Sequence, residues 1–386
     1  MNCQKNKFLL NKKYAYLNCA YMAPQLKKVE KAGRKGLTKK RQPNLITPDD
    51  FFHDLNTIKM LFSELTNAGD KNRITLIPSA SYGIANVVNN ISLTKGDNVV
   101  VAGDQFPSNV YPWMNACQAQ QAELKIVTAP ESTENRGKIW NEKILNSIDS
   151  KTKAVALGHV HWADGTLFEL IAIRKKCDEV GAALVIDGTQ SVGALPFDIQ
   201  EIKPDALIVA AYKWLLGPYS VGVAYYGERF DQGKPIEQNW INRLNSENFA
   251  ELVNYRNEYQ SGADRYGVGE RSNFILNPML IESFKQILQW QPANIQEYCK
   301  NLMAPAIEEI RSKGYYIEDE SQRASHLFGI KIPTDKMDAL AKALKNHKVS
   351  ASIRGSFLRV SPHVYNDQRD VNKLLRAFRS IGRADS

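Results

Sequence analysis

Residues 183–218 read ALVIDGTQSVGALPFDIQEIKPDALIVAAYKWLLGP, and this stretch decides the fold. It begins with an apolar run rich in β-branched side chains, residues 183–186, which is typical of a strand buried on both faces. A second run of the same character covers residues 206–210. The separation between Asp187 and Lys213 leaves room for one crossover, so we expect two neighbouring parallel strands.

Each of these two strands is followed by a residue that can carry chemistry. Asp187 comes directly after the first strand, and Lys213 follows the second. Open α/β sheets bind their ligands at the carboxyl ends of the strands, so the acid and the amine are expected to face one crevice. Each residue also has an ordinary explanation, because an Asp after a strand often caps the next helix and a Lys there is often a solvated surface residue.

A carboxylate and a lysine at one sheet edge are what pyridoxal 5'-phosphate requires. Its aldehyde forms a Schiff base with a lysine, here Lys213, and its pyridinium nitrogen takes a carboxylate partner, here Asp187. The carboxylate keeps the ring protonated, so the ring can accept electrons from the substrate. We therefore predict this cofactor, with Lys213 also serving as the base that moves the substrate's α-proton.

Two short motifs in this stretch resemble the cofactor-binding core of class V aminotransferases: residues 187–190, Asp-Gly-Thr-Gln, and the Tyr212-Lys213 pair. These are fold-type I enzymes that include cysteine desulfurases, kynureninases and isopenicillin N epimerase-like proteins. The resemblance extends from about Tyr16 to the C-terminus. It implies that Gln190 donates a hydrogen bond to the cofactor's phenolic oxygen and that Tyr212 reaches the phosphate.

A small-residue turn after an earlier strand is a candidate phosphate site. The strand at residues 74–77 leads into Ser79, Ala80 and Ser81, and a helix is predicted over residues 84–91. Free backbone N–H groups at a helix start, with hydroxyls beside them, suit an anion, so we assign Ala80 and Ser81 to the cofactor phosphate. A Ser-rich turn that only caps the helix is the alternative.

The resemblance also assigns aromatic and imidazole side chains to the cofactor. Phe106 matches the residue that relatives place on the pyridine ring, although it could instead be a core aromatic. His159 occupies the position from which relatives contact the phenolic oxygen or the substrate, and Trp162 would wall the pocket. His159 and His161 have no third ligand nearby, so we predict no metal site.

The remaining site residues come from the second half of the chain. Ser272 and Asn273 lie in a long polar, Gly-rich segment, and in the family the equivalent pair reaches the phosphate of the neighbouring subunit. We therefore expect a homodimer with shared active sites. Arg359, with Arg354 as the fallback, resembles the family's anchor for a substrate carboxylate, and an ordinary surface charge is the alternative for either arginine.

The predicted fold class is α/β, as in fold-type I transferases. Seven apolar strands alternate with helices, which favours a mostly parallel seven-stranded sheet. The strands are expected at residues 74–77, 99–102, 124–128, 154–158, 183–186, 206–210 and 221–226. We expect an N-terminal segment over residues 1–48, a large cofactor-binding domain over 49–291 and a small α+β domain over 292–386.

The charge pattern argues against a nucleic-acid partner. The formal net charge is +9, but 12 of the 50 Lys and Arg residues lie within residues 1–41 beside the single acid Glu30, so the remainder is nearly neutral. The basic block at residues 27–41 has no interleaved aromatics that could stack on bases.

No apolar run approaches the roughly 18 residues that a bilayer span needs, and the N-terminus lacks the pattern of a secretory signal. We therefore expect a soluble cytoplasmic protein without a membrane partner. The five cysteines are widely spaced, without a CxxC motif or a Cys/His cluster, which argues against a disulfide framework and a zinc site.

Together these features predict a pyridoxal-phosphate-dependent enzyme acting on an amino acid or a similar small molecule. Cysteine desulfurase or selenocysteine lyase activity is the alternative, and a catalytically silent protein on the same scaffold is a further one. Transamination, elimination, racemisation and C–C or C–S cleavage share this apparatus, so the sequence does not select the reaction.

Overall fold

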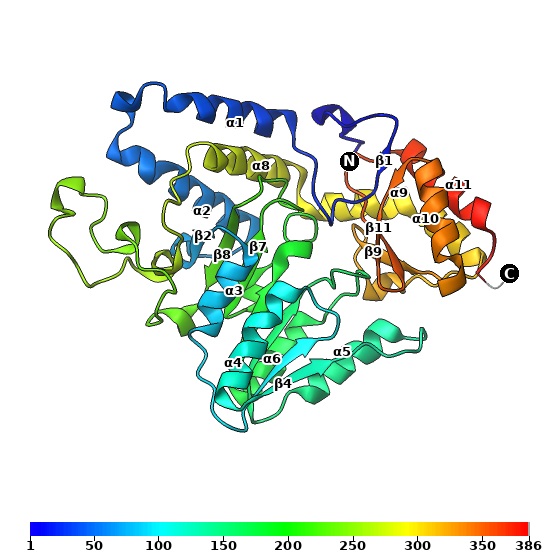
Figure 1. The fold of residues 1–386 in the computed structure, drawn as a ribbon, viewed down its shortest axis with the longest axis horizontal. Coiled ribbons are helices and arrows are strands. Elements are labelled where there is room, and N and C mark those ends of the chain that lie inside the picture. Colours follow the sequence, from blue (N-terminus) through cyan, green and yellow to red (C-terminus); the bar gives the residue numbers. More distant parts are fainter. Residues whose placement is uncertain (385–386) are drawn as a thin grey trace.

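The structure is a computed structural model that describes residues 1–384. A seven-stranded sheet with the order β2-β8-β7-β6-β5-β3-β4 lies at its centre (Figure 1). The strands are β2 (Ile74–Ile77), β3 (Asn98–Ala102), β4 (Glu123–Val127), β5 (Thr152–Gly158), β6 (Ala183–Asp187), β7 (Ala206–Ala210) and β8 (Gly222–Tyr226). β8 alone runs in the opposite direction to the other six strands, so the predicted α/β fold with a mostly parallel sheet is confirmed.

The central strands are apolar on both faces because each face packs into its own hydrophobic core. In β3, Val99 and Val101 belong to one core, while Val100 and Ala102 belong to the other. Parallel strands buried in this way need helices on both sides of the sheet. β6 and β7 are parallel neighbours, with Asp187 opposite Ile208, as the spacing of the two apolar runs predicted.

Helices from both halves of the chain cover the sheet. Side chains of α3 and α4 fill one core, and those of α2, α5, α6 and α8 contribute to the other. α1 and α8 lie side by side (Figure 1). The bounds are α1 (Lys27–Lys39), α2 (His53–Thr66), α3 (Ala80–Val88), α4 (Tyr111–Gln120), α5 (Arg136–Ser147), α6 (Leu170–Val180), α7 (Ile199–Ile202) and α8 (Leu276–Trp290).

The start of α3 differs from the prediction. This helix begins at Ala80, four residues before the expected start at residue 84, and it ends at Val88. The Ser79 side chain accepts a hydrogen bond from the Tyr82 N–H, which stabilises an earlier first turn. The sequence prediction missed this start because it treated Ser79 to Gly83 as a turn that precedes the helix.

A smaller α+β region follows the sheet. β9 (Phe328–Lys331), β11 (Ser352–Arg354) and β12 (Phe357–Val360) form an antiparallel sheet with the order β11-β12-β9. Its helices are α9 (Pro292–Ser312), α10 (Met337–Asn346) and α11 (Gln368–Ile381). The boundaries of separate domains stay a prediction.

The N-terminal segment is tied to this smaller region. β1 (Ala15–Tyr16) pairs in parallel with β10 (Val349–Ser350), and Figure 1 shows the blue N-terminal chain lying among the orange C-terminal elements. Ala15 and Leu17 are buried in the same hydrophobic core as residues of α9, α10 and α11. The two ends of the chain therefore pack together on one side of the sheet.

Two negative findings concern membranes and metals. Among the described residues, no helix is long and apolar enough to cross a bilayer. Within residues 1–384, no group of three or more His, Cys, Asp and Glu side chains is arranged to hold a metal ion.

Candidate active site

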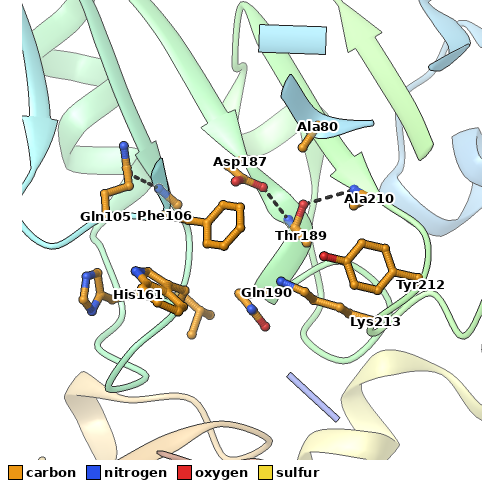
Figure 2. A pocket seen from close by; sticks show the side chains of 13 residues that line it. Ala80, Gln105, Phe106, His161, Asp187, Thr189, Gln190, Ala210, Tyr212 and Lys213 are labelled. Carbon is orange, nitrogen blue, oxygen red and sulfur yellow. Dashed lines mark hydrogen bonds between the residues drawn. The ribbon is translucent and has the colours of Figure 1, made fainter. Parts of the chain in front are cut away.

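A pocket lies where β3, β5, β6 and β7 end, at the carboxyl edge of the sheet (Figure 2). Six side chains that the sequence assigned to the cofactor line it: Ala80, Phe106, Asp187, Gln190, Tyr212 and Lys213. Trp162, expected as a wall, lines it too. Residues that come from five separate segments thus meet in one place, because parallel strands end at the same edge.

Lys213 is the central group of this pocket. Its side chain is only 6% exposed, and its Nζ atom lies 5.2 Å from the centre of the Phe106 ring and 5.4 Å from that of Tyr212. Within residues 1–384, Nζ makes neither a hydrogen bond nor an ion pair. Burial lowers the pKa of Lys213 to about 8, although the nearby Asp187 carboxylate acts in the opposite direction.

A tight turn after β7 presents this lysine. The Leu216 N–H donates to the Lys213 carbonyl, and Leu216 itself has a left-handed φ of 52°. Gly193 packs against the turn with a φ of 101°, and a Cβ atom there would lie 2.5 Å from the Trp214 carbonyl oxygen. Only glycine permits this close approach, so Gly193 is required for the position of Lys213 and Trp214.

Asp187 both caps a turn and faces the pocket. Its Oδ1 atom accepts a hydrogen bond of 3.0 Å from the Thr189 N–H, while Thr189 Oγ1 accepts from the Ala210 N–H at 3.0 Å (Figure 2). These bonds connect the ends of β6 and β7 and hold the carboxylate in place. No hydrogen bond within residues 1–384 involves the second oxygen, Oδ2, so it can accept from a ring N–H.

Gln190 is fixed by hydrogen bonds to three other parts of the chain. Its Oε1 atom accepts from Trp214 Nε1 at 2.8 Å, and its Nε2 donates to the Ala20 carbonyl at 3.2 Å. The Gln190 backbone carbonyl accepts from Nε2 of His326, a buried residue of the C-terminal region, at 2.7 Å. One N–H of the Gln190 amide remains available for a ligand oxygen.

The N-terminus of α3 borders the pocket through Ala80. Ser81 does not line the pocket; its hydroxyl lies 3.0 Å from that of Ser79. Free N–H groups at this helix start, with two hydroxyls beside them, suit a phosphate group. The Ser79 hydroxyl caps the helix, so the capping interpretation is confirmed, while the phosphate assignment of Ala80 and Ser81 stays a prediction.

Phe106 and Trp162 form an aromatic wall. Their rings meet edge to face with centroids 5.4 Å apart, and Trp162 Nε1 donates to the Asp104 carbonyl at 2.6 Å. Phe106 is half-buried and lines the pocket, so it is available to a planar ring.

A second cavity continues from the pocket and shares Phe106, Trp162, Tyr212 and Lys213 with it. The two candidate carboxylate anchors, Arg354 and Arg359, line this cavity. The Arg359 side chain is 1% exposed and donates from Nη1 to the Trp162 carbonyl at 2.8 Å. Burial, with Arg354 nearby, lowers the pKa of Arg359 to about 10.

The structure does not bring His159 into the pocket lining. Its ring packs edge-on against Phe197 with centroids 5.6 Å apart, and burial lowers its pKa to about 4. The histidine that lines the pocket is His161, whose Nδ1 lies 2.9 Å from Asp164 Oδ1. Residues two apart point to the same side of a regular strand, but β5 ends at Gly158 and the chain bends at His159, so the two histidines point in different directions.

Ser272 and Asn273 are also outside the pocket of their own chain. The Ser272 hydroxyl donates to the Phe51 carbonyl at 2.6 Å, and Asn273 Oδ1 accepts from the N–H groups of Ile275 and Leu276 at the start of α8. Their assigned role requires a partner subunit and stays a prediction.

Two pocket residues were missed by the sequence reasoning. Gln105 spans the ends of β3 and β5, because its Nε2 donates to the Ala156 carbonyl and its Oε1 accepts from the Gly158 N–H. Thr189 lies inside a motif that was recognised but was given no role. Their polar side chains directly after strand ends were the available signal.

Comparison with known proteins agrees with this fold. The family model for aminotransferase class-V matches residues 47–374. A relative, the uncharacterized aminotransferase YcbU of Bacillus subtilis, is 23% identical over 80% of this chain and 79% of its own length. A cysteine desulfurase of Escherichia coli is 27% identical over 47% of this chain and 44% of its own length.

Among solved structures, the cystine C–S lyase C-DES in complex with cysteine persulfide matches with a TM-score of 0.84. Its identity is 16%, and the match covers 94% of this chain and 97% of that protein. At this identity the likeness supports the fold alone.

The fold and the pocket define an α/β enzyme with a buried lysine at the carboxyl edge of its sheet. The chain belongs to the aminotransferase class-V family. It is a pyridoxal-phosphate-dependent enzyme of that superfamily, as the sequence predicted.

The pKa of Lys213 gives the first prediction. In cofactor-free protein we expect this amine to react with an acylating reagent with a midpoint near pH 8 instead of its ordinary 10.5. Asp187→Asn removes a carboxylate that raises the pKa, so the midpoint falls, while Arg359→Gln removes a cation that lowers it, so the midpoint rises. Mass spectrometry of the Lys213 peptide measures the modified fraction against pH.

The exposed Lys31 in the same digest corrects for loss of reagent. A midpoint that neither substitution moves would show that these two charges do not act on Lys213.

Proposed function

We propose that Lys213 covalently holds the cofactor aldehyde and, once the substrate amine has displaced it, moves the proton at the substrate Cα. The observation that carries this proposal is an amine that is 6% exposed and has no hydrogen-bond or ion-pair partner within residues 1–384, in the same pocket as Asp187 and the start of α3. When bound, the cofactor supplies an electron sink for the bond broken at Cα. A pKa near 8 leaves Lys213 a substantial neutral fraction at physiological pH, which a base needs.

The surrounding residues would position the cofactor around this amine. Asp187 Oδ2 would accept from the ring N–H, and the remaining Gln190 N–H would donate to the phenolic oxygen. Phe106 would contact the ring face, and the N–H groups at the start of α3, with Ser81 and Tyr212, would hold the phosphate. Arg359 would hold the substrate carboxylate and so fix which bond at Cα is broken.

Trapping tests the role of Lys213. The purified protein is expected to be yellow, and borohydride reduction followed by peptide mapping is expected to leave the cofactor covalently on Lys213. Lys213→Ala should abolish the adduct because no other amine lines the pocket in residues 1–384. Lys59→Ala is a control, because Lys59 is also buried but pairs with Asp264 outside this pocket. An adduct on another lysine would refute the assignment.

The alternative reaction, cysteine desulfurisation, is suggested by several relatives and requires a thiolate to accept sulfur. Beyond residue 292 the sequence has only Cys299. Its thiol is fully buried in α9 beside the Pro362 carbonyl, and burial raises its pKa, so it is held neutral. A C–S lyase reaction that releases its product directly does not need this group.

We therefore predict no sustained desulfurase activity. Alanine production from cysteine, with and without a thiol reductant, should stay at the background of the Lys213→Ala variant, and Cys299→Ala should change nothing. Sustained turnover that is lost in Cys299→Ala would overturn this prediction.

A homodimer with shared sites is part of the proposal. It is supported by the segment at residues 231–262, which extends from the sheet in Figure 1 and exposes apolar side chains, with Val253 77% and Tyr255 97% exposed. Exposed apolar side chains that gather on one protruding segment are typical of protein–protein contact sites. In such a dimer, Ser272 and Asn273 would complete the phosphate site of the partner.

Mixing variants tests the shared site. Lys213→Ala and a Ser272→Ala, Asn273→Ala double variant should each bind the cofactor poorly. A mixed dimer carries one intact site if the sites are shared, so mixing the two should restore up to a quarter of the cofactor binding. Binding should also weaken on dilution below the dimer dissociation constant. No restoration in demonstrated mixed dimers would exclude sharing.

A further inference from the structure

Two arginines face one cavity beside the pocket, and within residues 1–384 neither pairs with a carboxylate. Arg354 donates only to its neighbouring carbonyl, of Ile353, and Arg359 to that of Trp162. The Nε atom of Arg359 is buried without a hydrogen-bond partner. Burying a guanidinium without a counter-charge costs free energy, so we expect these arginines to bind the anionic groups of a ligand.

The cavity carries an excess of positive charge. Its lining includes Lys213, Arg354 and Arg359 but no Asp or Glu. The cofactor phosphate does not balance these charges, because its assigned site at α3 borders the first pocket and Ala80 is not part of the second cavity. An ordinary amino-acid substrate would bring one carboxylate for two guanidinium groups.

The two guanidinium groups are held at different depths on a hairpin. Arg359 lies on β12 and is 1% exposed, while Arg354 ends β11 and is half-buried. Their Cζ atoms lie 5.7 and 5.5 Å from the centre of the Trp162 ring, so one aromatic side chain orients both. Two anionic groups of one small molecule could therefore be bound at once.

We propose that the substrate is an α-amino acid whose side chain carries a second acidic group. Arg359 binds the α-carboxylate, and Arg354 binds the acidic group of the side chain. This inference rests on the proposed function, since it takes the amino group of the same substrate to displace Lys213 from the cofactor aldehyde. It adds the substrate class, and the fork of each guanidinium suits a carboxylate or another planar or tetrahedral oxyanion.

The test compares acids with their neutral isosteres in the cofactor-loaded enzyme. Spectral titration should show L-glutamate or L-aspartate binding about 10²-fold more tightly than L-glutamine or L-asparagine, the scale of one charge-assisted pair. Arg354→Gln should weaken binding of the acids about 10²-fold and leave the amides unchanged. Arg359→Gln should weaken acids and amides alike. Arg376→Gln, an exposed position on α11, is the control and should change neither.

A second measurement avoids any reaction with the cofactor. Glutarate and butyrate have no amino group, so their binding, followed by tryptophan fluorescence, reports the cavity alone. Glutarate should bind about 10²-fold more tightly, and Arg354→Gln should remove the difference. Equal affinities, or an equal loss for both ligands in Arg354→Gln, would overturn the inference.

The two proposals fail in distinguishable ways. If borohydride traps no cofactor on Lys213, the proposed function fails, whatever the preference for dicarboxylates. If trapping succeeds while acids and amides bind alike, only the substrate class is wrong. Thermal denaturation of each variant confirms that it remains folded.

Discussion

The organisation of the site depends on one constraint: the Lys213 amine is buried and has no hydrogen-bond or ion-pair partner within residues 1–384. A charged lysine in this position is costly, and the cost appears as a pKa lowered to about 8. Three nearby charges act on the amine: Asp187 raises its pKa, and Arg359 and Arg354 lower it. The parallel pairing of β6 with β7 places the carboxylate and the amine at one sheet edge. Because no ion pair occupies the amine, it is available for the roles proposed above, binding the cofactor aldehyde and moving a proton.

Hydrogen bonds between segments far apart in sequence fix the walls of the pocket. Gln190 connects the loop after β6 to Ala20, to Trp214 and to His326. His326 belongs to the C-terminal region and donates to the Gln190 carbonyl, while Gln190 Oε1 accepts from Trp214, the residue after Lys213. Two hydrogen bonds therefore connect the C-terminal region to the turn that carries Lys213. On the other side, Arg359 donates to the Trp162 carbonyl. The pairing of β1 with β10 brings the first residues of the chain to the same side of the sheet. The second cavity therefore combines residues from both chain ends, Ala20 to Met22 with Arg354 and Arg359, whereas the first pocket is lined by residues between Ala80 and Lys213.

The charges divide the site into two functional parts. Around the sheet edge, one carboxylate and the positive end of α3 suit a cofactor with a ring nitrogen and a phosphate. The adjoining cavity is lined by Lys213, Arg354 and Arg359 without an acidic residue, and aromatic rings limit its space. Such a cavity selects its ligand by charge, because a neutral group would leave a guanidinium unpaired. Under the proposals made above, the chemistry common to the family would depend mainly on the first pocket and the choice of substrate on the two arginines of the second cavity.

The sequence by itself determined the seven strands and the placement of Asp187 and Lys213 at one sheet edge, because apolar runs set the strands and parallel strands end at one edge. The resemblance to the family identified five further residues, and each lines at least one of the two adjoining cavities: Phe106, Gln190, Tyr212, Arg354 and Arg359. Tertiary structure alone decided that α3 begins at Ala80, that His161 faces the pocket instead of His159, and that Gln105 spans two strands. The direction of a loop side chain depends on the segments that pack around it, and these come from distant parts of the chain.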